Sequence, residues 1–337
     1  MALSLQQSAA ELFGKLRFSV RYPPAAIEIG TDAVAAVRIR SERSGPCLVG
    51  FGIAPLRTGA GLTGGAPGAV PAHPVVREDL RRALGEAIAS AGIKPGKVSL
   101  LIPDSAARVW LLQLPEIPRG QHAVLEMIRW KIRKSIPFRI EDAVIAWQVL
   151  SRPSGTEPAV VLVGLIPQVF VSQCEALLAS VGLRVGLVDL SSFNLFNAYR
   201  HVIAQNGAAS EDLGVLNATE GYFTLMFFRG GELIFFRCKA HAEGESGAPE
   251  ERARTFRREV ATSLSYYTEK LRGVSLGRTL ARVADPALAE AGETLRSLGF
   301  GEIEPIDPSK IARLPEEMTE GTALYLAPAM GAASGRR

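Results

Sequence analysis

Apolar and polar residues follow one another in blocks along residues 213–237, and this stretch predicts two β-hairpins in series. An apolar strand at residues 213–216 leads into a polar turn at 217–221 and a second strand at 222–228. A Gly-Gly pair in the turn at 229–232 then precedes a third strand at 233–237. Glycine supplies the positive φ angles that tight hairpin turns need, so the turn residues support the hairpins independently of the apolar runs.

The same arrangement occurs once more near the start of the chain. Residues 27–32 run from a strand into a turn containing Gly30, Thr31 and Asp32, residues 34–40 form the returning strand, and residues 46–53 form a third strand. A chain that opens two segments in this way is predicted to be internally duplicated. Spacing alone leaves open the alternative of two unrelated hairpins.

The segment between the hairpin units predicts a compact α+β module. Helical spacing begins at residue 76 and stops at Gly92, and apolar strands follow at residues 98–102 and 107–114. A second helix at 119–136 must end at Pro137, because the residue before a proline is pushed out of the helical region. Strands at 143–150 and 159–166 and a helix at 168–181 complete the module.

These elements divide the chain into five predicted parts. Residues 1–24 form a leader, residues 25–75 with 182–207 form a first domain, and residues 76–181 form the module inserted into it. Residues 212–331 form a second, reduced domain after a small-residue linker, and residues 332–337 form a disordered tail. Within the second domain we expect helices at 256–271 and 286–298 and strands at 278–283 and 302–306.

Composition adds limits on compartment and chemistry. The chain has 337 residues, 47% hydrophobic, with a net charge of +4, which is too weakly basic to argue for nucleic acid. Cys47, Cys174 and Cys238 are odd in number and far apart, which fits neither a zinc site nor a disulfide framework. Ser191, Ser192 and Ser263 have no adjacent histidine for a nucleophilic relay.

The first residues carry neither a signal peptide nor a membrane span. Residues 5, 9, 12, 13 and 16 are apolar and fall on one helical face, with Lys15 and Arg17 at its end. Such a segment is expected either to lie on a membrane or partner surface or to dock on the body of the protein.

Several stretches together resemble PilM, the type IV pilus assembly protein family of the actin-like ATPase superfamily. They are residues 26–39, 98–118, 124–150, 182–194 and 213–237, and the most specific feature is a helix containing Trp130 that ends at Ile136-Pro137-Phe138 before a strand. The resemblance implies an α/β, actin-like (ribonuclease H-like) two-domain fold with a small α+β module inserted in the first domain. It also implies a cytoplasmic protein, peripheral to the inner membrane, that binds the N-terminal peptide of a PilN-like membrane protein and contacts other pilus assembly or motor proteins.

In that family the two hairpin turns hold ATP and Mg²⁺, and here both turns depart from the family pattern. Glu28 replaces an Asp, Ala35 replaces a Lys, and an Asp-Ile-Gly becomes Asn217, Ala218 and Thr219, followed by Glu220. An Asn lacks the negative charge that holds Mg²⁺, and Thr219 adds a Cβ where a phosphate should approach the backbone. We therefore predict a remnant nucleotide pocket at Gly30, Thr31, Asp32, Asn217 and Thr219 that does not turn ATP over.

The resemblance places the partner peptide in a groove between the module and the first domain. We predict that Trp130, Ile136, Pro137 and Phe138 bind it, with Arg129, Lys131, Arg133, Lys134 and Arg139 nearby. These basic residues are either a solvated helix face or a surface for anionic lipid or an acidic partner segment. Nucleic acid is not expected, because the basic residues are not interleaved with several stacking aromatics.

The leading hypothesis is therefore a non-enzymatic adaptor. An active ATPase whose partner binding is switched by nucleotide, and the equivalent L-type component of a type II secretion system, remain alternatives. A sugar or acetate kinase relative would need an acid-base pair in the interdomain cleft, and the sequence does not supply one.

Overall fold

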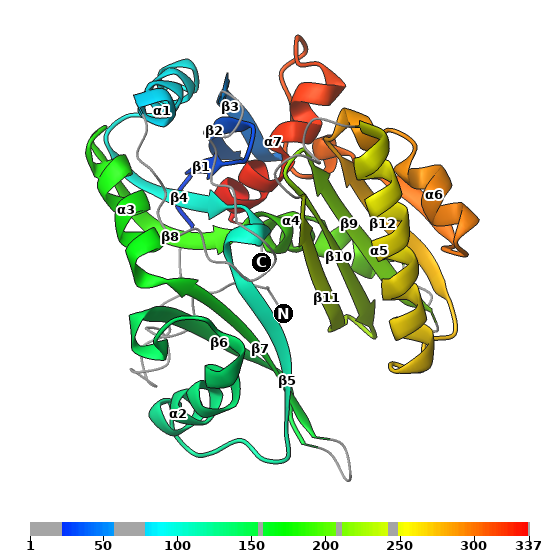
Figure 1. The fold of residues 1–337 in the computed structure, drawn as a ribbon. Coiled ribbons are helices and arrows are strands. Elements are labelled where there is room, and N and C mark those ends of the chain that lie inside the picture. The colour runs from blue at the N-terminus through cyan, green and yellow to red at the C-terminus, as the bar shows by residue number, and fades with distance from the viewer. Residues whose placement is uncertain (1–21, 57–77, 154–157, 207–210, 242–248, 336–337) are drawn as a thin grey trace.

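The computed structural model describes residues 22–56, 78–153, 158–206, 211–241 and 249–335, and builds them around three sheets. Two sheets have five strands each, and a smaller sheet has three (Figure 1). The predictions for the leader at residues 1–21 and for the loop at residues 57–77 lie outside the described residues.

The first sheet grows from an antiparallel meander of β1 (Ala25–Ile29), β2 (Ala33–Glu42) and β3 (Gly45–Pro55). Two parallel strands, β4 (Gly96–Ile102) and β8 (Leu183–Leu190), extend it in the order β3-β2-β1-β4-β8. The strands β1 and β4 are buried along most of their length, which suits their near-continuous apolar sequences. The helix α1 (Glu78–Ser90) packs on β2 and β3.

The second sheet repeats this plan. Its meander is β9 (Asp212–Thr219), β10 (Tyr222–Arg229) and β11 (Glu232–Ala240), and the parallel strands are β12 (Leu276–Val283) and β13 (Glu302–Pro305). The order β11-β10-β9-β12-β13 matches that of the first sheet strand for strand, so the predicted duplication is confirmed and the two hairpin units are not unrelated. The helices α5 (Pro249–Glu269) and α6 (Ala291–Ser297) cover this sheet on one side (Figure 1).

The predicted helix at residues 286–298 is in fact two elements. A 3-10 turn at Pro286–Leu288, capped by Asp285, precedes α6.

The small module has its own sheet, in the order β5-β7-β6, formed by β5 (Arg108–Leu114), β7 (Ala159–Pro167) and β6 (Ala143–Ser151). The helix α2 (Gln121–Ile132) covers one face of this sheet through Val124, Ile128 and Ile132. A 3-10 turn at Arg133–Ser135 follows α2 before Pro137, as the proline rule requires.

The predicted module of residues 76–181 is too large. The strand β4 lies in the first sheet between β1 and β8, because Val98–Ile102 is apolar at nearly every position and needs cover on both faces. The helix α1 belongs to the first domain because it packs on β2 and β3. The helix α3 (Gln168–Ala179) also buries Phe170, Cys174 and Leu178 in the core of the first domain.

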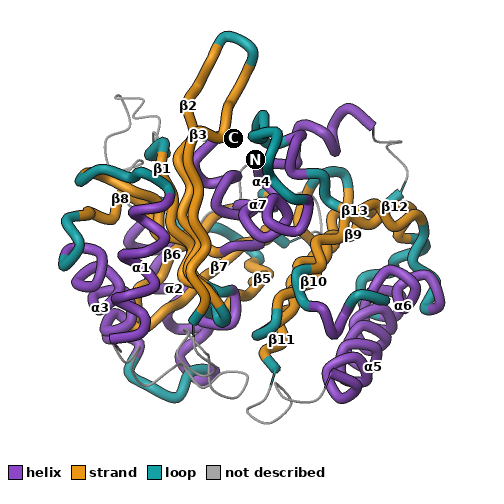
Figure 2. Tube along the Cα trace, turned by 90° about the horizontal axis from the view of Figure 1, so that it is seen from above, coloured by secondary structure: helices purple, strands orange, loops and turns teal. Residues whose placement is uncertain are grey.

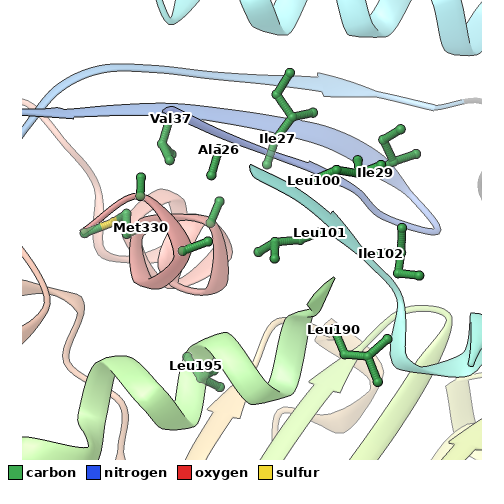
Figure 3. Close-up of a cluster of buried hydrophobic side chains, with 14 of the residues drawn as sticks. Ala26, Ile27, Ile29, Val37, Leu100, Leu101, Ile102, Leu190, Leu195 and Met330 are labelled. Carbon is green, nitrogen blue, oxygen red and sulfur yellow. The ribbon is translucent and has the colours of Figure 1, made fainter. Parts of the chain in front are cut away.

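The last helix, α7 (Glu320–Ser334), corrects both the predicted tail and the predicted domain boundary. It lies between the first sheet and α4 (Ser191–Asn206), and Figure 3 shows Met330 on α7 below the strands that carry Ala26 and Val37. Residues Gly331, Ala332 and Ala333, which the sequence placed in or beside the tail, are buried. A helix that is apolar all round shows no periodic face, which is why only the apolar stretch at 322–326 was recognised.

Figure 2 shows the result from above, with the two sheets on either side of α4 and α7. None of the helices in the described ranges is long and apolar enough to cross a bilayer.

The close packing of α7 on α4 gives a first prediction, on stability. A Cβ added at Gly331 would lie 2.5 Å from the carbonyl oxygen of Asn194, so one of the two helices must move. We expect Gly331→Ala to lower the free energy of unfolding by about 1–3 kcal/mol, the usual cost of overpacking a core. Urea unfolding followed by circular dichroism measures it.

The matched control is Gly321→Ala at the exposed start of the same helix. A Cβ there meets no atom within 4 Å, so the substitution should be neutral or slightly stabilising. Equal effects at the two positions would contradict the buried placement of the C-terminal turn.

Candidate functional site

The candidate site lies where the first hairpin turns of the two domains meet. The turn between β1 and β2 contains Gly30, Thr31 and Asp32, and the turn between β9 and β10 contains Glu220 and Gly221. A Cβ added at Gly221 would lie only 2.3 Å from Cγ2 of Thr31. The two turns are therefore in direct contact, and only a residue without a side chain fits at position 221.

The second of these turns is shorter than predicted. Asn217, Ala218 and Thr219 are not part of the turn but continue β9, in register with Thr224, Phe223 and Tyr222 of β10. All three are buried, and the Thr219 hydroxyl donates a hydrogen bond to the Tyr222 carbonyl oxygen at 3.2 Å. The sequence placed the turn too early because Asn and Thr are common in turns, whereas here pairing within the sheet decides the conformation.

A buried arginine, Arg282 of β12, holds the centre of the site. Its side chain is 1% exposed, and its three nitrogens all donate hydrogen bonds. Nη1 donates to Oδ1 of Asn217 at 2.6 Å, and Nε and Nη2 donate to the carbonyl oxygens of Leu324 and Tyr325, both at 2.8 Å. Since Leu324 and Tyr325 belong to α7 and Asn217 to β9, this one guanidinium joins the second sheet to the helix beneath the first.

Tyr325 links Arg282 to the turn between β1 and β2. Its ring lies under the Arg282 guanidinium, with Cζ 5.8 Å from the ring centre, and its hydroxyl donates to Oδ1 of Asp32 at 3.0 Å. Burial, together with Asp32, raises the pKa of Tyr325 well above its usual value, so the phenol stays neutral and can donate. Asp32 is thereby held against α7.

Two buried carboxylates form a second layer behind Arg282. Ser191 donates from its hydroxyl to Oε1 of Glu28 at 2.7 Å. Asp104 accepts from the backbone N–H of Ser192 at 3.1 Å, from the Ser192 hydroxyl, and from the Thr224 hydroxyl at 2.6 Å. The Ser192 hydroxyl in turn accepts from Nδ2 of Asn217 at 2.8 Å, so the layer is continuous with the Arg282 contacts.

Burial dominates the ionisation of both carboxyls. Removal from water raises the pKa of Glu28, and the nearby Arg282 guanidinium offsets only part of this effect. Burial likewise raises the pKa of Asp104 against the hydrogen bonds that Ser192 and Thr224 donate to it. The positive charge of Arg282 favours the ionised form of both carboxyls and so lowers the pKa of each.

Acidic groups also surround the second turn. Burial raises the pKa of Glu220, and Asp32 and Asp285 add to the rise, while Arg252 opposes it. Arg252 lies 3.4 Å from Oδ1 of Asp285 and donates to the Glu220 carbonyl oxygen at 3.4 Å. A phosphate entering between the turns would meet these carboxyls, and both turns would have to separate to admit it.

Within the described ranges no group of three or more His, Cys, Asp or Glu side chains is placed to hold a metal ion. Sequence reasoning considered Ser191 as a helix cap, set Ser191 and Ser192 aside as nucleophiles, and assigned no role to Asp104 or Arg282. The one local signal for the second layer was a pair of serines directly after an apolar strand.

The predicted partner-binding residues are only partly brought together. Ile136, Pro137 and Phe138 line a shallow hollow of about 640 Å³ with Arg133, Arg139, Ile140 and Glu141, all from the module. Phe138 also packs in part on the core of the module. Trp130 is 77% exposed on α2 and does not line this hollow.

Sequence reasoning missed a second apolar hollow, of about 550 Å³, between the module and the second domain. One wall is β5, the edge strand of the module, and the other is β11, the edge strand of the second sheet. Val109, Leu111, Ile234, Phe235 and Tyr266 are among its lining residues. The two strands are far apart in sequence, so no local pattern could indicate that they face each other.

Comparison with known proteins places the fold. No family model matches the chain, and no curated protein matches it. Among solved structures, a chain of the PilM–PilN type IV pilus biogenesis complex aligns with a TM-score of 0.71 at 18% identity, over 94% of this chain and 98% of that one. The chain has an actin-like fold. The predicted likeness to PilM is thus confirmed for the fold, which is all that 18% identity shows.

Two further solved structures align less closely. A Bacteroides thetaiotaomicron protein with an actin-like ATPase fold gives a TM-score of 0.48 at 10% identity, over 88% of this chain and 95% of that one. The cytoplasmic domain of EpsL, an inner membrane component of the type II secretion system of Vibrio cholerae, gives 0.43 at 12% identity, over 90% and 93%.

The site generates a prediction about Arg282. Removing the guanidinium takes the nearby positive charge from Glu28 and the hydrogen-bond donors from the Leu324 and Tyr325 carbonyl oxygens. Arg282→Ala should therefore lower the free energy of unfolding by about 3–5 kcal/mol. The loss should grow as the pH rises above 4.5, the ordinary pKa of a glutamate, because burial raises the pKa of Glu28 above that value. At low pH Glu28 is protonated in both proteins, whereas at higher pH only the wild type has a cation to stabilise the carboxylate. Urea unfolding at several pH values measures both effects.

Arg278→Ala on the same strand is the control. Arg278 binds Glu304 near the surface with its side chain 19% exposed, so its loss should cost about 1 kcal/mol. Burial works against ionisation of Glu304, but hydrogen bonds from Arg278 and Lys310 outweigh it and lower the pKa. The control's effect should therefore stay constant from pH 5 to 8 and fade only below that range. A parallel pH dependence in both variants would show that Glu28 and Arg282 are not coupled.

Proposed function

We propose that this protein is a PilM-like adaptor of a type IV pilus inner-membrane assembly complex, and that it works without ATP hydrolysis. The observation that carries the proposal is the contact of the two turns, with Arg282 bridging the sheet of one domain and α7. The fold match to a chain of the PilM–PilN complex supports the biological setting. The protein acts in the cytoplasm, peripheral to the inner membrane.

The contacts of Arg282 give the physical reason for a nucleotide-independent scaffold. The resemblance implies that a nucleotide bound between the turns would touch both domains. In this chain Arg282 already makes such contacts with the Leu324 and Tyr325 carbonyl oxygens of α7, and Asn217 makes one with the Ser192 hydroxyl of α4. A ligand that must first break hydrogen bonds to a buried guanidinium loses much of its binding free energy.

The partner we propose is the cytoplasmic N-terminal peptide of a PilN-like membrane protein. Ile136, Pro137 and Phe138 present apolar surface beside Arg133 and Arg139 in one shallow hollow. An apolar anchor of the peptide would bind the corner, and an acidic group would be attracted by the two arginines. Trp130 would extend this surface along α2.

The absence of ATP binding is a direct test of the scaffold. Titration calorimetry with ATP and Mg²⁺ should give no binding tighter than about 1 mM, or about −4 kcal/mol. A thermal unfolding series provides an independent measurement, because a ligand that binds only the native state raises Tm. A dissociation constant near about 1 μM would overturn the proposal and favour a nucleotide-switched ATPase.

A second test concerns the partner site. Phe138→Ala and Trp130→Ala should each weaken binding of the PilN-like peptide, by up to about thirtyfold where the aromatic ring is a buried anchor. Fluorescence anisotropy with the labelled peptide measures the affinity. Circular dichroism must show that Phe138→Ala remains folded, because Phe138 packs partly on the module core.

Two controls locate the peptide. Val274→Ala removes a side chain that is 96% exposed in the loop after α5 of the second domain, and it should leave the affinity unchanged. Tyr266→Ala removes a half-exposed ring from the hollow between β5 and β11. If only Tyr266→Ala weakens binding, the adaptor function stands but the peptide lies in that second hollow.

A further inference from the structure

A second basic surface lies at the end of the first sheet where β1 and β4 begin. A hollow of about 530 Å³ is lined by Arg38, Lys94 and Lys97 together with Pro24, Ala25, Gly92 and Ile93. No Asp or Glu is among these residues. Lys94 and Lys97 are exposed, and Arg38 is half-buried.

The fold gathers these cations from separate strands and a loop. Arg38 of β2 donates from Nε to the Ala91 carbonyl oxygen at 3.3 Å, at the end of α1, which draws it to the loop that carries Lys94. Lys97 of β4 pairs in register with Arg184 of β8, so these two side chains lie on the same face of the sheet. Arg184 is also exposed, and it adds a fourth cation next to the hollow.

These charges are not neutralised within the part of the chain that the structure describes. Arg38, Lys94, Lys97 and Arg184 form no ion pair with a carboxylate there, in contrast to Arg129 and Arg139 of the module. Arg129 of α2 lies 2.7 Å from Glu126, and Arg139 lies 3.8 Å from Glu141. Lys131 donates to the Gln113 carbonyl oxygen at 3.2 Å.

The N-terminal segment joins the protein at this same surface. The described chain begins at Tyr22, and Pro23 packs beside Gly186, where an added Cβ would lie 3.3 Å from the proline ring. The 21 residues before Tyr22 carry Lys15, Arg17 and Arg21 but a single acid, Glu11, so the net charge of this segment is positive. Their apolar residues recur at the helical spacing typical of surface-bound amphipathic segments.

We propose that this surface, formed by Arg38, Lys94, Lys97 and Arg184, lies directly on an anionic lipid bilayer. Its uncompensated cations match the negative surface potential of such a membrane, and Pro24 and Ile93 offer small apolar groups at the level of the head groups. A nucleic-acid site is less well matched, because no aromatic ring lines the hollow. The inference is independent of the peptide site, since it requires lipid and no protein partner.

The test is co-sedimentation of the full-length protein with two kinds of vesicle. One kind is phosphatidylcholine alone, and the other is phosphatidylcholine mixed with phosphatidylglycerol. We expect binding only to the anionic vesicles, and weaker binding at high salt because salt screens exposed charges. The combined variant Lys94→Glu, Lys97→Glu, Arg184→Glu should reduce partitioning by about a hundredfold or more, since each cation near the surface contributes about fivefold.

Two other triple reversals make the same change in net charge elsewhere. One is Arg254→Glu, Arg257→Glu, Lys270→Glu, at exposed positions on and just after α5. The other is Lys131→Glu, Arg133→Glu, Lys134→Glu, at exposed positions on α2 and in the 3-10 turn that follows it. Both should keep most of the binding, and all variants should keep the wild-type Tm. The proposal is wrong if the wild type ignores anionic vesicles, if the first triple still binds them, or if all three triples lose binding equally. Loss confined to the α2 variant would assign the membrane contact to the module instead.

Discussion

The structure depends on one buried positive charge between its two halves. Arg282 is 1% exposed and is satisfied on every side by Asn217 of one sheet and by two carbonyl oxygens of α7. A guanidinium is planar and presents its donors in a fixed fork, so it sets the distance and angle between the elements it joins more narrowly than an ammonium would. The buried carboxylates Glu28 and Asp104 are tolerable only because this cation and a set of hydroxyl donors lie beside them.

The duplicated fold explains why the charge of Arg282 lies between the two halves. In each sheet the first hairpin of the meander points its turn toward the other domain, and the parallel strand beside it, β4 or β12, brings a side chain behind the turn. In the first half that strand is followed by Asp104, which the Ser192 hydroxyl and backbone bind. In the second half β12 itself carries Arg282. The first half therefore contributes an acidic side chain and the second half a basic one, and α7 provides the carbonyl oxygens that bind the arginine.

Sequence reasoning recovered the elements whose signals are local. The paired hairpins, their glycine turns and the helix that stops before Pro137 follow from residues that are neighbours in the chain. The helix α7 was missed because residues 323–333 are buried nearly all round and show no amphipathic face. The strand β4 was assigned to the wrong sheet because an apolar sequence does not indicate which strands it pairs with. The Arg282–Asn217 and Asp104–Thr224 contacts join residues 65 and 120 positions apart, and such pairs are fixed only by the folded topology.

A closed cleft has a consequence for how such a scaffold could be controlled. In a two-state protein a ligand shifts the equilibrium only by its difference in affinity for the two states. Opening the two domains would expose Arg282, Glu28 and Asp104 together and break the hydrogen bonds from Arg282 to α7 and from Thr224 to Asp104, which places the open state several kcal/mol above the closed one. Under the function proposed above, a nucleotide would have to supply that difference beside the carboxyl groups of Glu220, Asp32 and Asp285. Binding events on the outer surfaces face no such cost, because the exposed cations around Lys97 and the apolar corner at Phe138 are available in the closed form.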